Sequence, residues 1–89
     1  MEITEIKIFA VEEKRVKAYS SVVFDQCFIV RDLKVIQGDS KLFVAMQSKR
    51  MKDGSYRDTV HPLNNDMRHK IETSVLVAYE KELNKKKLQ

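Results

Sequence analysis

The 89-residue chain has room for one domain with one hydrophobic core. Its 17 lysines and arginines outnumber its 13 aspartates and glutamates, which gives a formal net charge of +4. A single cysteine cannot form an internal disulfide, and together with two histidines it falls short of a four-ligand structural zinc site. Because so small a chain is only marginally stable without such supports, we expect it to self-associate as a dimer.

No apolar run follows a basic start at the N-terminus, so we expect no signal peptide. Uninterrupted apolar runs reach only five residues, as in Val75–Tyr79, whereas a helix that crosses a bilayer needs about 20. The lone cysteine suits a reducing compartment. These features predict a cytoplasmic protein that has no membrane partner.

The positive charge is unevenly distributed along the chain. Residues 1–46 carry seven Lys and Arg and seven Asp and Glu, whereas residues 47–89 carry ten and six. An excess confined to one half of a chain favours a polyanionic partner or an anionic surface. A solvated surface that only keeps the protein soluble is the alternative, and composition does not decide between them.

The first 36 residues predict three strands. Isoleucines spaced among charged residues indicate a first strand from about Glu2 to Val11. Apolar residues that alternate with polar ones predict a second strand at Val16–Phe24. The dipeptide Asp25-Gln26 is a plausible two-residue turn, and Cys27–Ile36 follows as a third strand.

A two-residue turn would fix the register of this hairpin. It places Phe24 opposite Cys27, Val22 opposite Ile29 and Ala18 opposite Leu33, all on the side of the sheet that faces the core. The other side would carry the apolar residues Tyr19, Val23, Phe28 and Val30. That side is too apolar to be wholly exposed, so we expect a helix to cover part of it and a second subunit to cover the rest.

The remaining elements follow in order. Leu42–Met46 predicts a short fourth strand, and Tyr56–Val60 predicts a further extended segment. Apolar residues spaced near 3.6 predict a helix from Asn65 to about Asn84, with Asn64 or Asn65 as its N-terminal cap. Strands that precede a single helix indicate an α+β fold, an antiparallel sheet of four to five strands followed by a C-terminal helix. We expect one domain over residues 1–84 and a basic tail over 85–89.

The segment Met46–Arg57 is the strongest candidate for a binding site, because it holds four cations and one carboxylate around a predicted Asp-Gly turn. Lysine and arginine neutralise phosphates, and Ser48 and Ser55 can donate hydrogen bonds to phosphate oxygens. The guanidinium of Arg50 fits a guanine edge, and Tyr56 can stack on an unpaired base. The alternative is an ordinary solvated loop.

Catalytic chemistry has little support in the sequence. His61 precedes a proline, and we expect its imidazole to have a structural role with a hydrogen bond to the backbone. We expect Cys27 to be a packing residue. No serine, histidine and aspartate arrangement can be assembled, and two glycines do not make a phosphate-binding loop. We therefore expect a protein that is not an enzyme and that needs no cofactor, metal or small-molecule substrate.

Four stretches of the chain carry a specific pattern, FVAM-x-SKR followed by RD-x-x-HP and an asparagine-capped helix. They are Asp32–Gly38, Leu42–Met46, Ser48–Arg50 and Tyr56–Asn64. From Met1 to about Tyr79, the chain closely resembles the bacterial stage V sporulation protein G (SpoVG) family. The resemblance implies a dimer of small α+β subunits that binds preferred sites in DNA and RNA. It also implies regulation of genes for septation and sporulation, capsule or virulence.

The basic motif of that family corresponds here to Ser48-Lys49-Arg50, and the resemblance also implicates Arg57 and the start of the helix. The full set of expected nucleic-acid contacts is Ser48, Lys49, Arg50, Lys52, Arg57, Arg68 and Lys70. This chain departs from the family at Gln47, where proline is common, and at His69, where glycine is common. A protein-interaction module of the division or sporulation machinery is the second hypothesis, with nucleic-acid binding then incidental.

Overall fold

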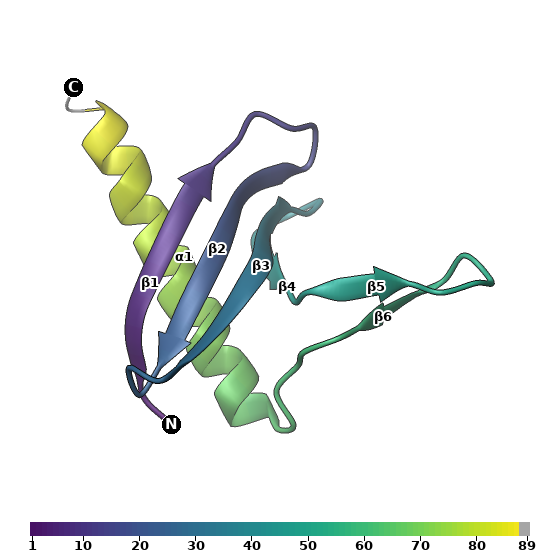
Figure 1. The fold of residues 1–89 in the computed structure, drawn as a ribbon. Helices are drawn as coiled ribbons and strands as arrows, with labels where there is room; N and C mark the ends of the chain where they lie inside the picture. Colours follow the sequence, from purple (N-terminus) through teal and green to yellow (C-terminus); the bar gives the residue numbers. More distant parts are fainter. Residues whose placement is uncertain (88–89) are drawn as a thin grey trace.

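A computed structural model of the chain describes the backbone of residues 1–87 and the side chains of residues 1–85. Four antiparallel strands form the main sheet in the order β1-β2-β3-β4, and a long helix, α1, crosses one of its faces (Figure 1). A separate two-stranded sheet, β5 and β6, stands away from this body. The elements are β1 Ile3–Ala10, β2 Val16–Phe24, β3 Phe28–Gln37, β4 Leu42–Ala45, β5 Ser48–Arg50, β6 Tyr56–Asp58 and α1 Asn65–Lys87. The predicted α+β class is confirmed.

The core lies between the sheet and α1. Alternate residues of β2 are buried, as the period of two predicts, and β3 adds Leu33 and Val35 on the same face. The helix contributes Ile71, Val75 and Tyr79, which recur every four residues and therefore lie along one side of it. Burial of an apolar side chain such as Val75 stabilises the fold by about 1.5–3 kcal/mol, so this stripe anchors α1 to the sheet.

The start of α1 is set by a side-chain cap. The Asn64 Oδ1 atom accepts a hydrogen bond of 2.8 Å from the Met67 backbone N–H, and the Arg68 N–H donates to the Asn64 carbonyl. Asn64 is therefore the capping residue, one of the two that the sequence predicts. The helix extends to Lys87, beyond the expected end near Asn84, and the last two residues of the expected tail lie outside the described residues. Within residues 1–87, no helix is long and apolar enough to cross a membrane.

The predicted register of the β2–β3 hairpin is wrong by one residue at the turn and by two farther along. Phe24 pairs with Phe28, Val22 with Val30 and Ala18 with Val35, because three residues rather than two connect the strands. The connecting backbone bonds to β1 instead of continuing β3. The Asp25 N–H donates to the Glu2 carbonyl at 2.8 Å, and the Gln26 N–H donates to the Thr4 hydroxyl at 3.0 Å. Cys27 consequently lies exposed in the turn and not on the core side.

A bulge in β3 accounts for the second error. Asp32 adopts a left-handed backbone conformation with φ of 62°, and the pairing with β2 shifts between Ser20 and Val22. The extra residue lets both Val30 and Leu33 face the core although they are three positions apart. Val30, which we predicted to lie on the outer side, is only 8% exposed.

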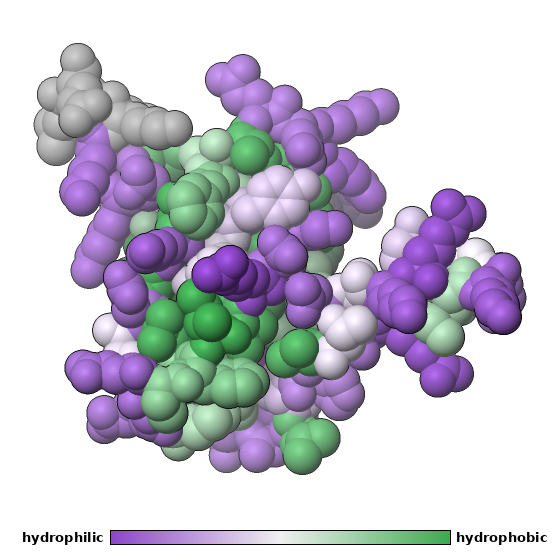
Figure 2. Space-filling model, in the orientation of Figure 1, coloured by the Kyte–Doolittle hydropathy of each residue, from purple (hydrophilic) through white to green (hydrophobic). Residues whose placement is uncertain are grey.

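The outer face of the main sheet has no covering element among the described residues, because α1 packs on the opposite face. Phe9 is 57% exposed and Ile29 is 45% exposed, with Tyr19 between β1 and β3 on the same face. Figure 2 shows apolar side chains gathered over this face. The expectation that the helix covers part of it is wrong. The expectation of a covering second subunit stays a prediction.

Candidate nucleic-acid interface

The basic segment forms a hairpin that we call the arm, residues 48–58. It follows β4 directly, and Figure 1 shows it projecting away from the main sheet and helix. Every residue from Ser48 to Thr59 is exposed. The sequence predicted a basic loop followed by an extended segment, and the structure pairs the two as β5 and β6.

The tip of the arm is a three-residue turn, Lys52-Asp53-Gly54. The Met51 N–H donates to the Ser55 carbonyl at 2.7 Å, and the Gly54 N–H donates back to the Met51 carbonyl at 3.0 Å. Gly54 has φ of 88°, which glycine adopts without strain, so the predicted Asp-Gly turn is confirmed. The turn is set by local chemistry and not by burial.

Ser55 also stabilises the tip through Asp53. Its hydroxyl donates to Asp53 Oδ1 at 2.6 Å, and its backbone N–H donates to the same atom at 2.9 Å. These hydrogen bonds, the hydroxyl first, hold the pKa of Asp53 below its usual value because they favour the charged carboxylate. The Ser55 hydroxyl is thereby occupied within the chain, in contrast to the phosphate contact that the sequence suggested.

The base of the arm is joined to the main sheet through Gln47. The Thr59 N–H donates to the Gln47 carbonyl at 2.8 Å, which closes the hairpin. The Gln47 side-chain amide donates to Asp32 Oδ2 at 3.4 Å and so reaches the bulge of β3. A proline at position 47 would supply neither this side-chain amide nor a backbone N–H. Here the side chain of Gln47 therefore contributes to the link between arm and sheet.

Strand pairing distributes the cations over both faces of the arm. Lys49 lies directly opposite Arg57 on one face, whereas Arg50 lies opposite Tyr56 on the other. Like charges opposite each other destabilise a strand pair, so a bound anion would relieve the repulsion between Lys49 and Arg57. Within the described residues the only salt bridge joins Arg15 and Asp39, neither of which belongs to the arm. The cations of the arm are thus available to an external partner.

Two depressions adjoin these cations. One near the tip has a volume of about 530 Å³ and is lined by Lys49, Arg50, Met51, Lys52 and Asp53. The other has a volume of about 470 Å³, lies between the arm and the start of α1, and is lined by Tyr56, Arg57, Asp58, His61 and Arg68. The structure therefore brings Arg57 and Arg68, 11 positions apart in the chain, to one concave surface.

Two members of the second depression, Asp58 and His61, were not among the predicted contacts. The His61 Nδ1 atom lies 3.0 Å from the Pro62 carbonyl, which can only accept, so Nδ1 carries the proton of this hydrogen bond. This agrees with the structural role predicted for His61 and leaves its Nε2 atom for another partner. The described residues contain no cluster of three or more His, Cys, Asp and Glu side chains that could hold a metal ion.

Lys70 is separated from the other predicted contacts. Its ammonium donates to the Met1 carbonyl at 3.1 Å, and its side chain lines a groove between β1 and α1. Two helical residues at this spacing point about 200° apart, which is why Arg68 faces the arm and Lys70 does not. Five of the seven predicted residues, Ser48, Lys49, Arg50, Lys52 and Arg57, lie on the arm itself.

Comparison with known proteins identifies one family. The family model described as SpoVG matches residues 1–81. A relative from Bdellovibrio bacteriovorus, named "Putative septation protein SpoVG", is 60% identical over 83 residues, which cover 93% of this chain and 77% of that protein. Relatives of the same name from Anaeromyxobacter sp. strain K and Myxococcus xanthus are 52% and 49% identical, over 96% and 93% of this chain and 84% of each protein. The chain therefore belongs to the SpoVG family.

Proposed function

We propose that this protein binds nucleic acid and that the arm makes the principal contacts. The observation that carries the proposal is the exposure of four lysines and arginines on a hairpin that contributes nothing to the core. Such residues displace the counterions condensed on a phosphate backbone, which drives binding at moderate salt. The protein acts in this proposal as a non-enzymatic regulator that prefers certain DNA or RNA sites and works as a dimer in the cytoplasm.

The shape of the arm favours duplex DNA as one ligand. A two-stranded ribbon fits the major groove, and its two faces would then meet opposite walls of that groove. Arg50 can donate two hydrogen bonds to a guanine edge, while Lys49 and Arg57 on the other face meet phosphates. Tyr56, 69% exposed beside Arg50, offers a stacking surface for an unpaired base in single-stranded RNA.

Arg57 and Arg68 extend this surface to the body of the protein. They line the same depression next to the start of α1, where the helix dipole favours anions. A phosphate in this depression would be held from the arm and from the helix at once. Lys70 is not part of this contact, because it lies on the other side of α1.

The role in gene regulation connected with septation is the finer part of the proposal. Its support is family membership, since the relatives are named for septation. A protein-interaction module is the second candidate, and the uncovered apolar residues of the outer sheet face support it. Val30, which the sequence placed on this outer face, is buried and gives the alternative no support.

Binding to DNA and RNA probes at several salt concentrations tests the proposal. We expect the double variant Lys49→Ala/Arg50→Ala to lose most of its affinity, and the slope of log K against log salt to fall by about 0.9 for each lost phosphate contact. The matched control is Lys14→Ala/Lys41→Ala, which removes the same charge from exposed positions outside the arm. Equal binding by the two double variants would reject the arm as the site.

An electrophoretic shift with competitor DNA and RNA separates the two candidate functions. A nucleic-acid regulator should retain measurable binding at about physiological salt, where even non-specific complexes have dissociation constants of about 10⁻⁴–10⁻⁶ M. Absence of any shift under these conditions would favour the protein-interaction module.

A further inference from the structure

The outer face of the main sheet carries two aromatic rings in one row. Strand pairing places Phe9 of β1 opposite Tyr19 of β2, and Tyr19 opposite Lys34 of β3. Phe9 is 57% exposed, and the Tyr19 hydroxyl donates to Glu13 Oε2 at 3.2 Å, which restrains the tyrosine ring. A ring held in this way loses little conformational freedom when a ligand stacks on it. The row is therefore a surface on which planar groups can stack.

A hollow of about 350 Å³ adjoins this row and is lined by both apolar and cationic side chains. Its lining includes the two rings and Ile29, together with the cations Lys7 and Arg31. This volume falls within the range of ligand pockets, about 300–1,000 Å³. Figure 2 shows hydrophilic side chains lying among the apolar ones over this face. Rings with cations beside them fit a ligand that is both planar and anionic.

The hollow is also next to the base of the arm. Asp32 lines it, and the Gln47 side-chain amide at the arm's base donates to Asp32 Oδ2 at 3.4 Å. Glu13 and Asp32, the carboxylates that contact this surface, are thus both engaged within the chain. A polyanion that contacts the arm can continue onto the outer face without leaving the protein.

We propose that the outer face is a second nucleic-acid contact and that its ligand is an unpaired strand of RNA or DNA. Bases stack on Phe9 and Tyr19, while phosphates meet Lys7, Arg31 and Lys34. The inference rests on the proposed function and divides it between two surfaces, since the arm fits the groove of a duplex. The bases of a duplex are already stacked on one another, so only unpaired bases can reach the rings.

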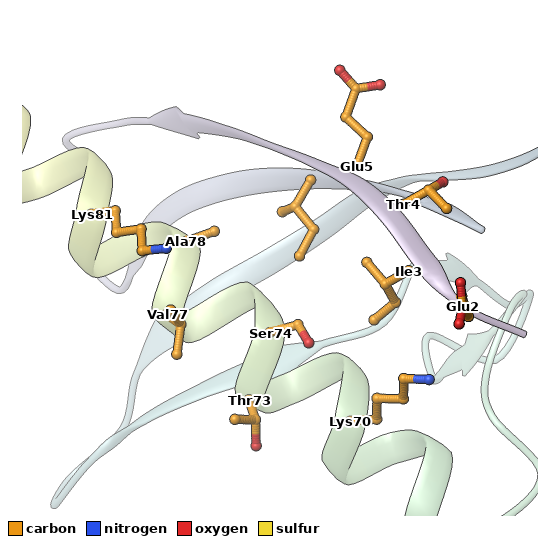
Figure 3. A pocket seen from close by; sticks show the side chains of 11 residues that line it. Glu2, Ile3, Thr4, Glu5, Lys70, Thr73, Ser74, Val77, Ala78 and Lys81 are labelled. Atoms are coloured by element: carbon orange, nitrogen blue, oxygen red, sulfur yellow. The ribbon is translucent and has the colours of Figure 1, made fainter. Parts of the chain in front are cut away.

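The larger groove between β1 and α1 lacks this combination of side chains. It has a volume of about 660 Å³, and Figure 3 shows Lys70 and Lys81 reaching it from the helix. Within the described residues no aromatic side chain lines it, and the Lys70 ammonium already donates to the Met1 carbonyl. The groove offers no stacking surface, so we place the single-strand contact on the outer face alone.

Fluorescence anisotropy with labelled oligouridylate, oligothymidylate and a DNA duplex tests the stacking row. Phe9→Ala should weaken binding of both single strands by about tenfold and leave duplex binding unchanged. Phe28→Ala is the matched control, because Phe28 is 58% exposed but lies on the same side of β3 as the buried Val30. Phe9→Tyr keeps a ring and should bind as the wild type does. An equal loss in Phe9→Ala and Phe28→Ala, or no loss in Phe9→Ala, would overturn the proposal.

Salt dependence separates the cations of the face from its rings. Lys7→Ala should reduce the slope of log K against log salt for single strands by about 0.7, because one phosphate contact is lost. Phe9→Ala removes no charge, so it should weaken binding without changing the slope. Lys81→Ala removes the same charge from the exposed helix side of the groove and serves as the control. An equal change of slope in the two lysine variants would reject the assigned phosphate contacts.

Tyrosine fluorescence reports stacking directly, because the chain has three tyrosines and no tryptophan. Tyr79 is only 7% exposed, so in the variant Tyr56→Phe the quenching caused by a single strand arises at Tyr19. We expect this variant to retain the quenching and Tyr19→Phe/Tyr56→Phe to lose it. Loss of the quenching in Tyr56→Phe alone would assign stacking to the arm and reject the outer face.

The same measurements distinguish failure of this inference from failure of the proposed function. A wild type that binds the duplex but no single strand would refute the outer face and leave the arm intact. Single-strand binding that depends on Phe9, together with duplex binding that survives Lys49→Ala/Arg50→Ala, would refute the arm and leave the outer face intact. Dissociation of a dimer by Phe9→Ala, seen by light scattering, would show that a second subunit covers the face and would overturn the inference.

Discussion

The main body and the arm are folded by different forces. In the body, β2 alternates buried and exposed residues, and α1 buries one stripe against the sheet. In the arm, all residues are exposed, and the hairpin depends on its turn and on backbone hydrogen bonds. The contrast shows why the arm suits binding, since its side chains are free of any packing role.

The two regions also differ in their balance of charge. Residues 1–46 have equal numbers of positive and negative side chains, whereas the arm has four cations and two carboxylates. One of those carboxylates, Asp53, is engaged in the turn itself. A region that buries none of its side chains in the core can concentrate like charge, although the repulsion costs some stability.

The largest predicted effect separates the stability of the two regions. Leu33 is 1% exposed in the core, so Leu33→Ala should lower the free energy of unfolding by about 2–5 kcal/mol. Tyr56 on the arm is 69% exposed, and Tyr56→Ala should change it by less than about 0.5 kcal/mol. Urea denaturation followed by circular dichroism measures both values. Comparable destabilisation by the two variants would mean that the arm contributes to the core.

The second prediction concerns nucleic-acid binding, to which we expect a residue of the arm to contribute and a residue of the body not to contribute. Arg57→Ala should weaken binding to DNA and RNA probes and reduce the salt slope by about 1, because it removes one phosphate contact. Lys70→Ala removes the same charge on the far side of α1 and should leave the slope unchanged. Fluorescence anisotropy with a labelled probe measures both. An equal loss in the two variants would indicate general electrostatic attraction in place of a defined surface.

A smaller effect is expected at the junction between arm and helix. Asn64→Ala removes the cap of α1 and should cost about 1 kcal/mol of stability. Asn64→Asp keeps an acceptor at this position and serves as the control. Thermal unfolding should show the loss only in the alanine variant. If both variants unfold at the same temperature, the hydrogen bond from the Met67 N–H to the Asn64 side chain does not stabilise the helix.

The smallest effect concerns the tip of the arm at acid pH. The hydrogen bonds from Ser55 lower the pKa of Asp53 from its ordinary value of 3.8. A lowered pKa in the folded state stabilises the tip above the unfolded pKa, and this contribution is lost as the pH falls through the folded pKa. Amide hydrogen exchange at Ser55, read by NMR, should therefore accelerate beyond its intrinsic pH dependence below about pH 4. The Asp53→Ala variant should lack this transition, and a transition that persists in it would assign the effect elsewhere.

Sequence reasoning succeeded where a local rule sets the structure. The start of α1 follows from the cap at Asn64 and from apolar residues spaced near 3.6, and both signals lie within one segment. The turn at Gly54 follows from its backbone freedom in the same way. The sequence also predicted that the arm belongs to the candidate site, because its cations lie close together between Ser48 and Arg57.

The errors arose where distant segments compete for the same backbone. The turn after β2 bonds to Glu2, just before β1, and to Thr4 within β1, and no pattern around Asp25 reveals this. The three-residue turn moved Val30 into the core, and the bulge at Asp32 then brought Leu33 to the same face. Because the side chains of a strand alternate, a shift of one residue reverses the face of every residue beyond it.

The sequence by itself determined the α+β class, the helix, the Asp-Gly turn and the cationic segment, because each depends on neighbours within a few residues. Only the tertiary structure decided that Arg68 lines the same depression as Arg57, while Lys70 lies on the other side of α1. The path of the chain between arm and helix sets that placement. The tertiary structure likewise decided that, within residues 1–87, β1 pairs with β2 alone, since strand order depends on pairing between segments far apart in the chain.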